Sequence, residues 1–225
     1  MITSAIIPAA GSGLRFGEKK QLKEINGKPL IYYTLLPFIS SKMVDEIIIV
    51  ISNDDINIIN SIIKRINSKK PITIVEGSST RQGSIKNALK AINHQSKCIC
   101  IHDAVRPFIQ KELIEKTISS LQECDAVIVG NKATDTLKEV SNNLIINTID
   151  REKIWYVQTP QVFLKEALLS AYQYADKENI IGTDDATLLE KAGYEVKIIN
   201  DKSINYKITT KEDWIVAEAI FNNIN

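Results

Sequence analysis

The chain has few residues of the kinds that build disulfide frameworks, zinc sites or catalytic triads. Its 225 residues include three cysteines, two histidines, two methionines and two tryptophans. With two histidines and no CxxC or HExxH spacing, a structural zinc site is not expected. Cys98 and Cys100 alternate within an apolar run, so both should point to one face of a strand. We interpret them as small buried hydrophobic residues of a protein in a reducing compartment.

Neither an excess of one charge nor a long apolar run is present. Lys and Arg number 28 against 27 Asp and Glu, a net charge of +1, which argues against a nucleic-acid surface. No apolar run approaches the length of a membrane span. No charged segment leads into a signal peptide, and a candidate site loop already begins at Ala9, which leaves no room for a leader. The sequence therefore predicts a cytoplasmic protein with no nucleic-acid or membrane partner.

The organisation along the chain predicts one α/β domain over residues 1–225. Predicted strands cover residues 2–8, 46–51, 72–76, 97–102, 125–129 and 195–200. Predicted helices cover residues 30–39, 54–66, 80–92, 111–121, 165–175, 184–192 and 211–221. The strands are rich in Ile and Val with little alternation, which is typical of a parallel sheet buried on both faces. The alternation of strands and helices predicts a doubly wound, mostly parallel sheet.

One segment interrupts the alternation of strands and helices. Residues 133–140 and 144–149 flank Ser141-Asn142-Asn143, which has the composition of a hairpin turn. A hairpin inserted in a parallel α/β fold predicts an arm, here residues 133–157, that projects from the body.

The first predicted strand leads into a glycine-containing loop, Ala9-Ala10-Gly11-Ser12-Gly13, followed by Arg15, Lys19, Lys20 and Gln21. Glycines let the backbone approach a ligand and turn N–H groups toward phosphate oxygens. The third position of a dinucleotide fingerprint holds Phe16 and no GK[ST] follows, so neither nucleotide motif is complete. Two or three cations beside such a loop are suited to a triphosphate. An ordinary strand-to-helix turn is the alternative.

Other polar stretches follow predicted strands. Asp103 ends a strand where open α/β sheets bind ligands, and its carboxylate is suited to Mg²⁺ beside phosphate oxygens. The alternative is a turn residue with Arg106 as its ion partner. In the loop 77–84, Thr80 is either a helix cap or part of a base-reading loop. Lys207 lies in a strand-like run, where an exposed edge residue is the alternative. Asp184-Asp185 reads as a helix start without a catalytic role, and residues 148–151 and 158–161 are unusual for loops.

These stretches together resemble the 2-C-methyl-D-erythritol 4-phosphate cytidylyltransferase family. The matching motifs occur in one order over nearly the whole chain: AAGSGLRFG, KKQ, TRQGS, HDAVRP, DTLKEV, TIDREKIW, QTPQVF, GTDDATLLE and NYKITT. The resemblance implies a Rossmann-like nucleotidyltransferase fold. It also implies transfer of CMP from CTP, with Mg²⁺, to a polyol phosphate of the non-mevalonate route to isoprenoid precursors.

The resemblance also implies roles for individual residues. The catalytic cations are Arg15, Lys20 and Lys207. The CTP site is formed by Ala9, Ala10, Gly11, Ser12, Gly13, Arg81, Ser84 and Ala104. The polyol phosphate is bound by Asp103, Arg106, Thr136 and Arg151, and Asp103 also holds the metal. Because the family supplies the counterpart of Arg151 from the arm of a partner subunit, a homodimer is implied.

Three other functions remain as alternatives. A cytidylyltransferase acting on ribitol 5-phosphate would share the fold and the motifs, although Thr148 to Arg151 and Ile154-Trp155 fit the methylerythritol phosphate branch better. A non-catalytic nucleotide-binding domain would be favoured by loss of Asp103 or Lys20, and both are present. A nicotinamide dehydrogenase does not fit Phe16 at the third glycine position.

Overall fold

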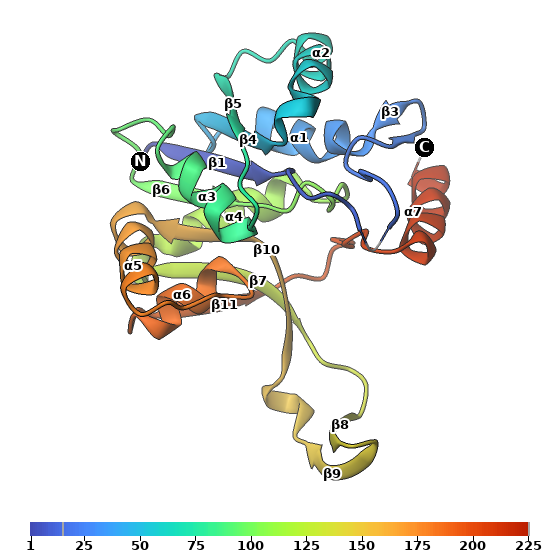
Figure 1. Cartoon of the computed structure of the whole chain (residues 1–225), viewed down its shortest axis with the longest axis vertical. Coiled ribbons are helices and arrows are strands. Elements are labelled where there is room, and N and C mark those ends of the chain that lie inside the picture. The colour runs from blue at the N-terminus through green and yellow to red at the C-terminus, as the bar shows by residue number, and fades with distance from the viewer. Residues whose placement is uncertain (15, 225) are drawn as a thin grey trace.

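The computed structural model describes residues 1–14 and 16–224 and is built around a seven-stranded sheet (Figure 1). The sheet consists, in spatial order, of β11 (Val196–Asn200), β7 (Ala126–Lys132), β10 (Trp155–Leu164), β6 (Cys98–Ile101), β1 (Thr3–Pro8), β4 (Glu46–Ile51) and β5 (Ile72–Glu76). All strands and helices predicted for the α/β body are present, with ends that differ by a few residues. The prediction of a doubly wound, mostly parallel sheet is confirmed.

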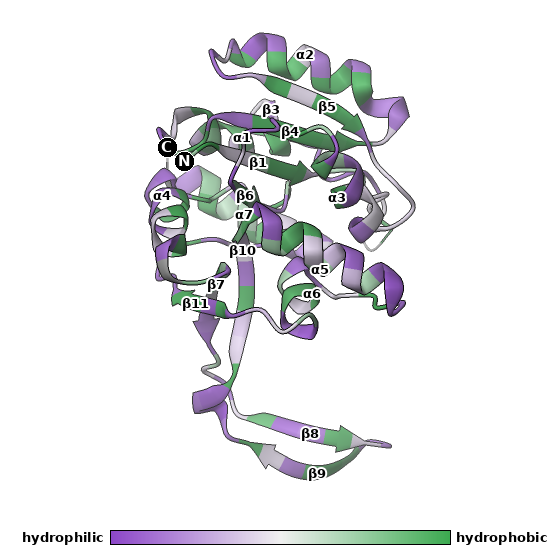
Figure 2. Ribbon diagram, turned by 90° about the vertical axis from the view of Figure 1, so that its left-hand side faces the viewer, coloured by the Kyte–Doolittle hydropathy of each residue, from purple (hydrophilic) through white to green (hydrophobic). Residues whose placement is uncertain are grey.

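Helices cover both faces of the sheet because successive strand residues point to opposite sides. In β1, Ala5 and Ile7 belong to one apolar cluster and Ile6 belongs to the other. The first cluster includes residues of α1 (Leu30–Ser40), α2 (Ile56–Ile66) and α4 (Lys111–Ser119). The second includes residues of α3 (Arg81–Leu89), α5 (Lys165–Lys177) and α6 (Asp185–Lys191), which lie together on the right of Figure 2. Cys98 and Cys100 are both buried in the first cluster and so lie on one face of the sheet, as predicted.

The strand β10 corrects the interpretation of residues 158–161 as an unusual loop. It is antiparallel to both β6 and β7. Its pairing with β7 shifts between Gln158 and Gln161, and the intervening Thr159–Pro160 peptide is cis. A proline has no N–H to donate and reads as a strand breaker, and the register shift lets β10 pass Pro160 without a ladder bond there.

The predicted hairpin is present as β8 (Leu137–Ser141) and β9 (Leu144–Ile149). Asn142 and Asn143 both have positive φ, at 51° and 63°, as a two-residue turn of this kind requires. The first arm strand begins at Leu137, later than the predicted residue 133. Figures 1 and 2 show this pair of strands extending away from the sheet and its helices. The pair forms the outer part of the predicted arm, residues 133–157, which we call the β-arm.

The helix α7 (Lys211–Ile224) packs beside the loop that follows β1. Phe16 and Trp214 make an edge contact with ring centroids 5.7 Å apart, and Phe108 and Phe221 belong to the same cluster. A short antiparallel pair, β2 (Glu24–Ile25) and β3 (Lys28–Pro29), precedes α1. Within residues 1–14 and 16–224, no helix has both the length and the apolar character needed to cross a membrane.

Candidate active site

Loops from neighbouring strands meet at the carboxyl edge of the sheet and enclose three adjoining cavities. The largest, the loop cavity of about 440 Å³, is lined by Pro8, Ala10, Gly11, Ser12, Ser78, Ser79, Thr80, Arg81, Ser84 and Asp103. The lysine cavity of about 120 Å³ is lined by Pro8, Ala9, Gly11, Gly13, Lys20, Gln21, Ala104 and Val105. The arginine cavity of about 260 Å³ is lined by Arg81, Asp103, Arg106, Val157, Gln158, Thr159, Gln161, Thr183, Asp184 and Lys207. Asp103 and Arg81 line both the loop cavity and the arginine cavity.

The glycine-containing loop after β1 has a conformation that its sequence requires. Gly13 has φ +73°, and a Cβ there would lie 1.8 Å from the Glu18 carbonyl oxygen, so a larger residue is excluded. The buried Gln21 side chain donates from Nε2 to the Ala9 oxygen at 2.7 Å and to the Gly11 oxygen at 2.9 Å. The loop backbone is thereby fixed against the sheet.

Two lysines follow this loop, and they have different environments. Lys19 donates to the buried Asp55 carboxylate at 2.7 Å and ties the loop to the chain after β4. Lys20 lines the lysine cavity, and its ammonium lies 5.8 Å from the centre of the Phe16 ring. Arg15, predicted to be a catalytic cation, lies outside the described residues.

The loop before α3 provides the helix cap, one of the two roles that the sequence left open for Thr80, and it also lines a cavity; base reading stays a prediction. Thr80 caps α3 by accepting from the Gly83 N–H at 3.0 Å, and it also lines the loop cavity. The Ser84 hydroxyl donates to the Thr80 oxygen at 2.8 Å and accepts from the Ser78 N–H at 2.9 Å. A Cβ at Gly77 would lie 2.3 Å from the Cβ of Ala10, so this glycine lets the two loops approach each other.

Asp103 carries the charge at the point where the cavities meet. Its Oδ2 atom lies 2.9 Å from Lys207 Nζ and 3.3 Å from Arg106 Nε. Burial alone would raise the pKa of this carboxyl, but Lys207, Arg81 and Arg106 together hold its pKa well below the usual range. Asp103 is therefore ionised at neutral pH. Arg106 is its ion partner, as the turn alternative proposed, and the cavity lining shows that Asp103 also faces the site.

Lys207 reaches this carboxylate from a segment without regular structure. The prediction of a strand-like run at residues 205–209 is wrong. The segment is bound instead by individual contacts: Arg106 Nη1 donates to the Asn205 oxygen at 2.9 Å, and Ile208 N–H donates to the Val105 oxygen at 2.9 Å. Among the described residues, no strand of the sheet pairs with this segment, so it stays irregular despite its strand-like composition.

The side chains that hold Asp103 in place were not predicted from the sequence. The Asp103 N–H donates to Thr159 Oγ1 at 3.1 Å, and Thr159 Oγ1 lies 3.0 Å from His102 Nδ1. His102 Nε2 lies 3.3 Å from the Arg106 carbonyl oxygen. Burial lowers the pKa of His102 to about 4, so the imidazole is neutral at pH 7. It then donates to the Arg106 oxygen and accepts from the Thr159 hydroxyl. No sequence signal linked Thr159 to His102, because Thr159 lies in the strand that was not predicted.

Thr136 and Arg151, predicted to bind the second substrate, lie on the β-arm and its base. Arg151 is exposed, and its Nη1 donates to the Thr134 oxygen at 2.6 Å. Neither residue lines any of the three cavities of its own chain. Their contribution from a partner subunit stays a prediction.

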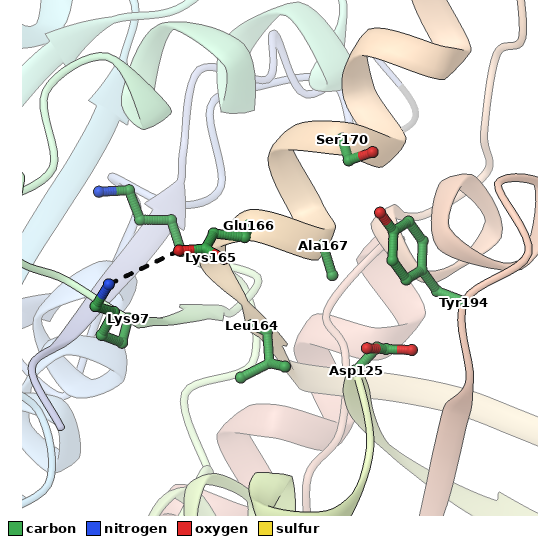
Figure 3. Close-up of a pocket in the computed structure, with 8 residues that line it drawn as sticks. All are labelled: Lys97, Asp125, Leu164, Lys165, Glu166, Ala167, Ser170 and Tyr194. Atoms are coloured by element: carbon green, nitrogen blue, oxygen red, sulfur yellow. Dashed lines mark ion pairs between the residues drawn. The ribbon is translucent and has the colours of Figure 1, made fainter.

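A fourth cavity, of about 530 Å³, lies at the opposite edge of the sheet, where β6, β7 and β11 begin (Figure 3). It is lined by Lys97, Asp125, Leu164, Lys165, Glu166, Ala167, Ser170 and Tyr194. Lys97 and Glu166 form an exposed ion pair at 3.7 Å. Side chains of positive and of negative charge line this cavity, and Asp103 is not among its lining residues. In the described part of the chain, no group of three or more His, Cys, Asp or Glu side chains could hold a metal ion by itself.

Comparison with known proteins identifies relatives that match nearly the whole chain. The family profile for 2-C-methyl-D-erythritol 4-phosphate cytidylyltransferase matches residues 3–223. The enzyme of that name from Alkaliphilus metalliredigens is 40% identical over 97% of this chain and 92% of its own length. The one from Dictyoglomus thermophilum is 39% identical over 96% of this chain and 95% of its own length.

The fold is also similar to solved structures. The crystal structure of 4-diphosphocytidyl-2C-methyl-D-erythritol synthase from Anaerococcus prevotii superimposes with a TM-score of 0.88, at 38% sequence identity and 98% coverage of both chains. Sequence, fold and the order of the site loops agree. The chain belongs to the 2-C-methyl-D-erythritol 4-phosphate cytidylyltransferase family.

Proposed function

We propose that this chain transfers CMP from CTP to 2-C-methyl-D-erythritol 4-phosphate, giving 4-diphosphocytidyl-2-C-methyl-D-erythritol and pyrophosphate. The observation that carries the proposal is the ionised Asp103 at the junction of the loop cavity and the arginine cavity, paired with Lys207 and Arg106. Two phosphorylated substrates bound in these cavities would meet beside Asp103 and its cations. Membership of the family supports the identity of both substrates.

CTP is assigned to the loop cavity and the lysine cavity. Backbone N–H groups of Ala9 to Gly13 and the ammonium of Lys20 would bind the triphosphate, and Arg15 is proposed to add a further cation. The serine-rich loop 77–84 would surround the cytosine and ribose, with Ser84 fixing its shape.

The reaction forms one bond and breaks one bond at the α-phosphorus of CTP. An oxygen of the polyol phosphate attacks the phosphorus, and the bond to the departing pyrophosphate breaks. A phosphomonoester has a second pKa of about 6, so this oxygen is already ionised at neutral pH and needs no general base. The absence of a catalytic histidine fits this chemistry, since the neutral His102 is occupied in supporting Asp103.

The barrier arises from bringing anions together, and the cations of the site lower it. Lys207 would lie between Asp103 and the reacting phosphates, and Lys20 would neutralise charge that develops on the pyrophosphate side. Arg106 is buried and held on two sides, so we assign it the task of orienting Asp103 and the Lys207 segment.

The residues present fit a magnesium ion held mainly by substrate. Mg²⁺ commonly binds one or two carboxylates together with substrate phosphates and waters. Asp103 is ionised and lines both the loop cavity and the arginine cavity, so its carboxylate would hold the metal beside the substrate phosphates. When bound, the metal would neutralise charge on the phosphate oxygens.

We propose a homodimer in which the β-arm, residues 133–157, carries Thr136 and Arg151 to the partner's arginine cavity. Support comes from the projecting shape of the β-arm (Figure 1) and from its exposed apolar side chains. On the two strands β8 and β9 these side chains are Val140, Leu144, Ile145 and Ile146, exposed by 54%, 72%, 65% and 61%. Apolar surface of this kind marks an interface.

The proposal is tested by assaying the purified protein for release of pyrophosphate. CTP is supplied with 2-C-methyl-D-erythritol 4-phosphate or with ribitol 5-phosphate, and the nucleotide product is identified by mass. We expect turnover with the first polyol phosphate at a kcat/KM at least about 10²-fold above that with the second, since the site must match hydroxyl groups. Replacing CTP by UTP should cost a similar factor. Preference for ribitol 5-phosphate would assign the chain to that reaction instead.

A further inference from the structure

A buried carboxylate outside the three cavities holds one of their charged side chains. Arg81, the first residue of α3, forms an ion pair with Asp185, the first residue of α6, with Nη1 and Oδ2 2.7 Å apart. Asp185 is 1% exposed, and its other oxygen accepts a hydrogen bond from the Tyr172 hydroxyl at 2.6 Å. Asp185 Oδ1 is thus fixed by a hydrogen bond from the Tyr172 phenol, whereas the contact of Oδ2 with Arg81 is an ion pair without a hydrogen bond.

The starts of α3 and α6 are docked to each other by a second set of contacts. Gln82 donates to the Ile180 oxygen at 3.2 Å and accepts from the Gly182 N–H at 3.3 Å. The position of Asp185 relative to Arg81 is therefore set by backbone contacts as well as by charge.

Asp185 is not needed to begin its own helix. Asp184 provides the cap of α6, because its Oδ1 accepts from the Thr187 N–H at 2.9 Å. A buried ion pair is also a poor source of stability, since the desolvation of both charges offsets their attraction. The sequence interpretation of Asp184-Asp185 as a helix start accounts for the first residue of the pair and leaves the second unexplained.

Arg81 lies where such control matters. Among the described residues that line the loop cavity, Arg81 is the one cation and Asp103 is the one anion. Two carboxylates are thus available to Arg81. In the described parts of the chain its ion pair is with Asp185, while Asp103 pairs with Lys207 and Arg106. Burial would lower the pKa of Arg81, but Asp185 first and Asp103 second outweigh it and raise that pKa.

We propose that Asp185 is a positioning residue for the nucleotide site. Anchored by Tyr172, it holds the Arg81 guanidinium against the wall of the loop cavity and out of ion-pairing distance of Asp103. Arg81 is then available to the ribose and phosphates of the nucleotide, and Asp103 keeps Lys207. This inference rests on the proposed function, because it assigns Asp185 to binding of CTP rather than of the polyol phosphate.

The primary test is Asp185→Asn, which keeps the shape and the hydrogen bond from Tyr172 but removes the charge facing Arg81. We expect the KM for CTP, and the Kd of CTP measured by calorimetry without the polyol phosphate, to rise about tenfold, the scale of one charge-assisted hydrogen bond. Arg81 also lines the arginine cavity, but the inference assigns it to the nucleotide, so the KM for the polyol phosphate should change by less than about threefold. Asp176→Asn is the matched control, since it breaks the exposed ion pair with Lys86 and should alter neither constant.

A double-mutant cycle separates positioning from general structural support. In an Arg81→Ala background, Asp185→Asn should have no further effect on the Kd of CTP, because the residue through which it acts is gone. Tyr172→Phe should raise this Kd about threefold in the wild-type background and leave it unchanged beside Arg81→Ala. If Asp185→Asn does not fold, the Tyr172→Phe cycle decides the question.

Two results would overturn the inference. Equal effects of Asp185→Asn with and without Arg81 would make it a structural residue, and an unchanged Kd of CTP in the single variant would remove any role in nucleotide binding. Neither outcome affects the proposed function, which is judged by the turnover of the wild-type protein with CTP and 2-C-methyl-D-erythritol 4-phosphate.

Discussion

Lys207 Nζ lies 2.9 Å from Asp103 Oδ2, so a segment without regular structure delivers a cation to the carboxylate at the end of β6. Asp103 lines both the loop cavity and the arginine cavity, and Lys207 lines the arginine cavity. Lys207 is held at this place by the negative charge of Asp103, and Asp103 is kept ionised by Lys207 and its neighbours. Each group therefore depends on the other, and the first prediction follows from that dependence.

Replacing Asp103 by Asn keeps the side-chain shape and removes the charge that orients Lys207 and would bind the metal. We expect kcat to fall at least about 10²-fold, comparable to the loss of one electrostatic stabiliser. The measurement is steady-state turnover across a magnesium titration. Asp125→Asn, at the opposite edge of the sheet, is the control and should stay within about twofold of wild type. Near-full activity of Asp103→Asn would reduce Asp103 to a turn residue.

The Gln21 carboxamide provides a second prediction, because it donates to two carbonyl groups of the glycine-containing loop. In Gln21→Glu a carboxylate would face both oxygens, and the repulsion should displace the loop. We expect the KM for CTP to rise at least about tenfold, and less in Gln21→Met, which loses the donors but adds no charge. Isothermal titration measures whether the Kd of CTP rises more in Gln21→Glu than in Gln21→Met. A Glu variant that binds CTP as tightly as wild type would show that Gln21 does not hold the loop.

Complementation tests whether the β-arm acts on a partner subunit. Lys20→Ala and Arg151→Ala should each be inactive alone. The first variant loses a cation of the nucleotide site, and the second loses a guanidinium that can make two hydrogen bonds. In a mixed dimer one site receives both defects and the other receives neither. Random reassortment makes half of the dimers mixed, so activity should return to about a quarter of wild type. No recovery, despite exchange of subunits shown by a mass-tagged chain, would place Arg151 in its own site.

The protonation of His102 predicts how stability depends on pH. Unfolded histidine takes up a proton below about pH 6.5, whereas burial lowers the pKa of folded His102 to about 4. Between these values the unfolded state binds more protons, so the free energy of unfolding should fall as the pH is lowered through this window, by about 3 kcal/mol in total. Urea unfolding at pH 7, 6 and 5 measures the slope.

The two histidines supply a matched pair for this experiment. His102→Gln should flatten the slope between pH 6.5 and 5 because it removes the titrating group. His94→Gln, at an exposed position, should keep the wild-type slope. Equal slopes in all three proteins would mean that His102 is not held neutral by the fold.

Much of the fold could be predicted because its signals are local. Runs of Ile and Val mark strands such as β4, and Asn142-Asn143 marks the hairpin turn through a backbone conformation that asparagine tolerates. The strand β10 was missed because Pro160 hides it, and the pairing that overrides the proline comes from β6 and β7, distant in sequence. Local patterns do not report such tertiary contacts.

The site was predictable where residues follow a strand and not where they support one another. Asp103 and the loop after β1 were found by their position at strand ends. The contacts of His102 with Thr159 and of Arg81 with Asp185 join residues far apart in the chain, and neither pair forms a spaced motif. Lys207 was found by resemblance, although its segment was wrongly predicted to be a strand.

The contact between Phe16 and Trp214 joins two segments that the ribosome synthesises at widely separated times. The loop after β1, which we propose to bind the triphosphate, is synthesised early, whereas the aromatic side chains of α7 that pack beside it are synthesised roughly 200 residues later. At translation rates of about 5 to 20 residues per second, this interval lasts about 10 to 40 s. A nascent chain would therefore acquire most of its sheet before the loop after β1 is closed against α7, and tight nucleotide binding should begin only after residue 221 has left the exit tunnel.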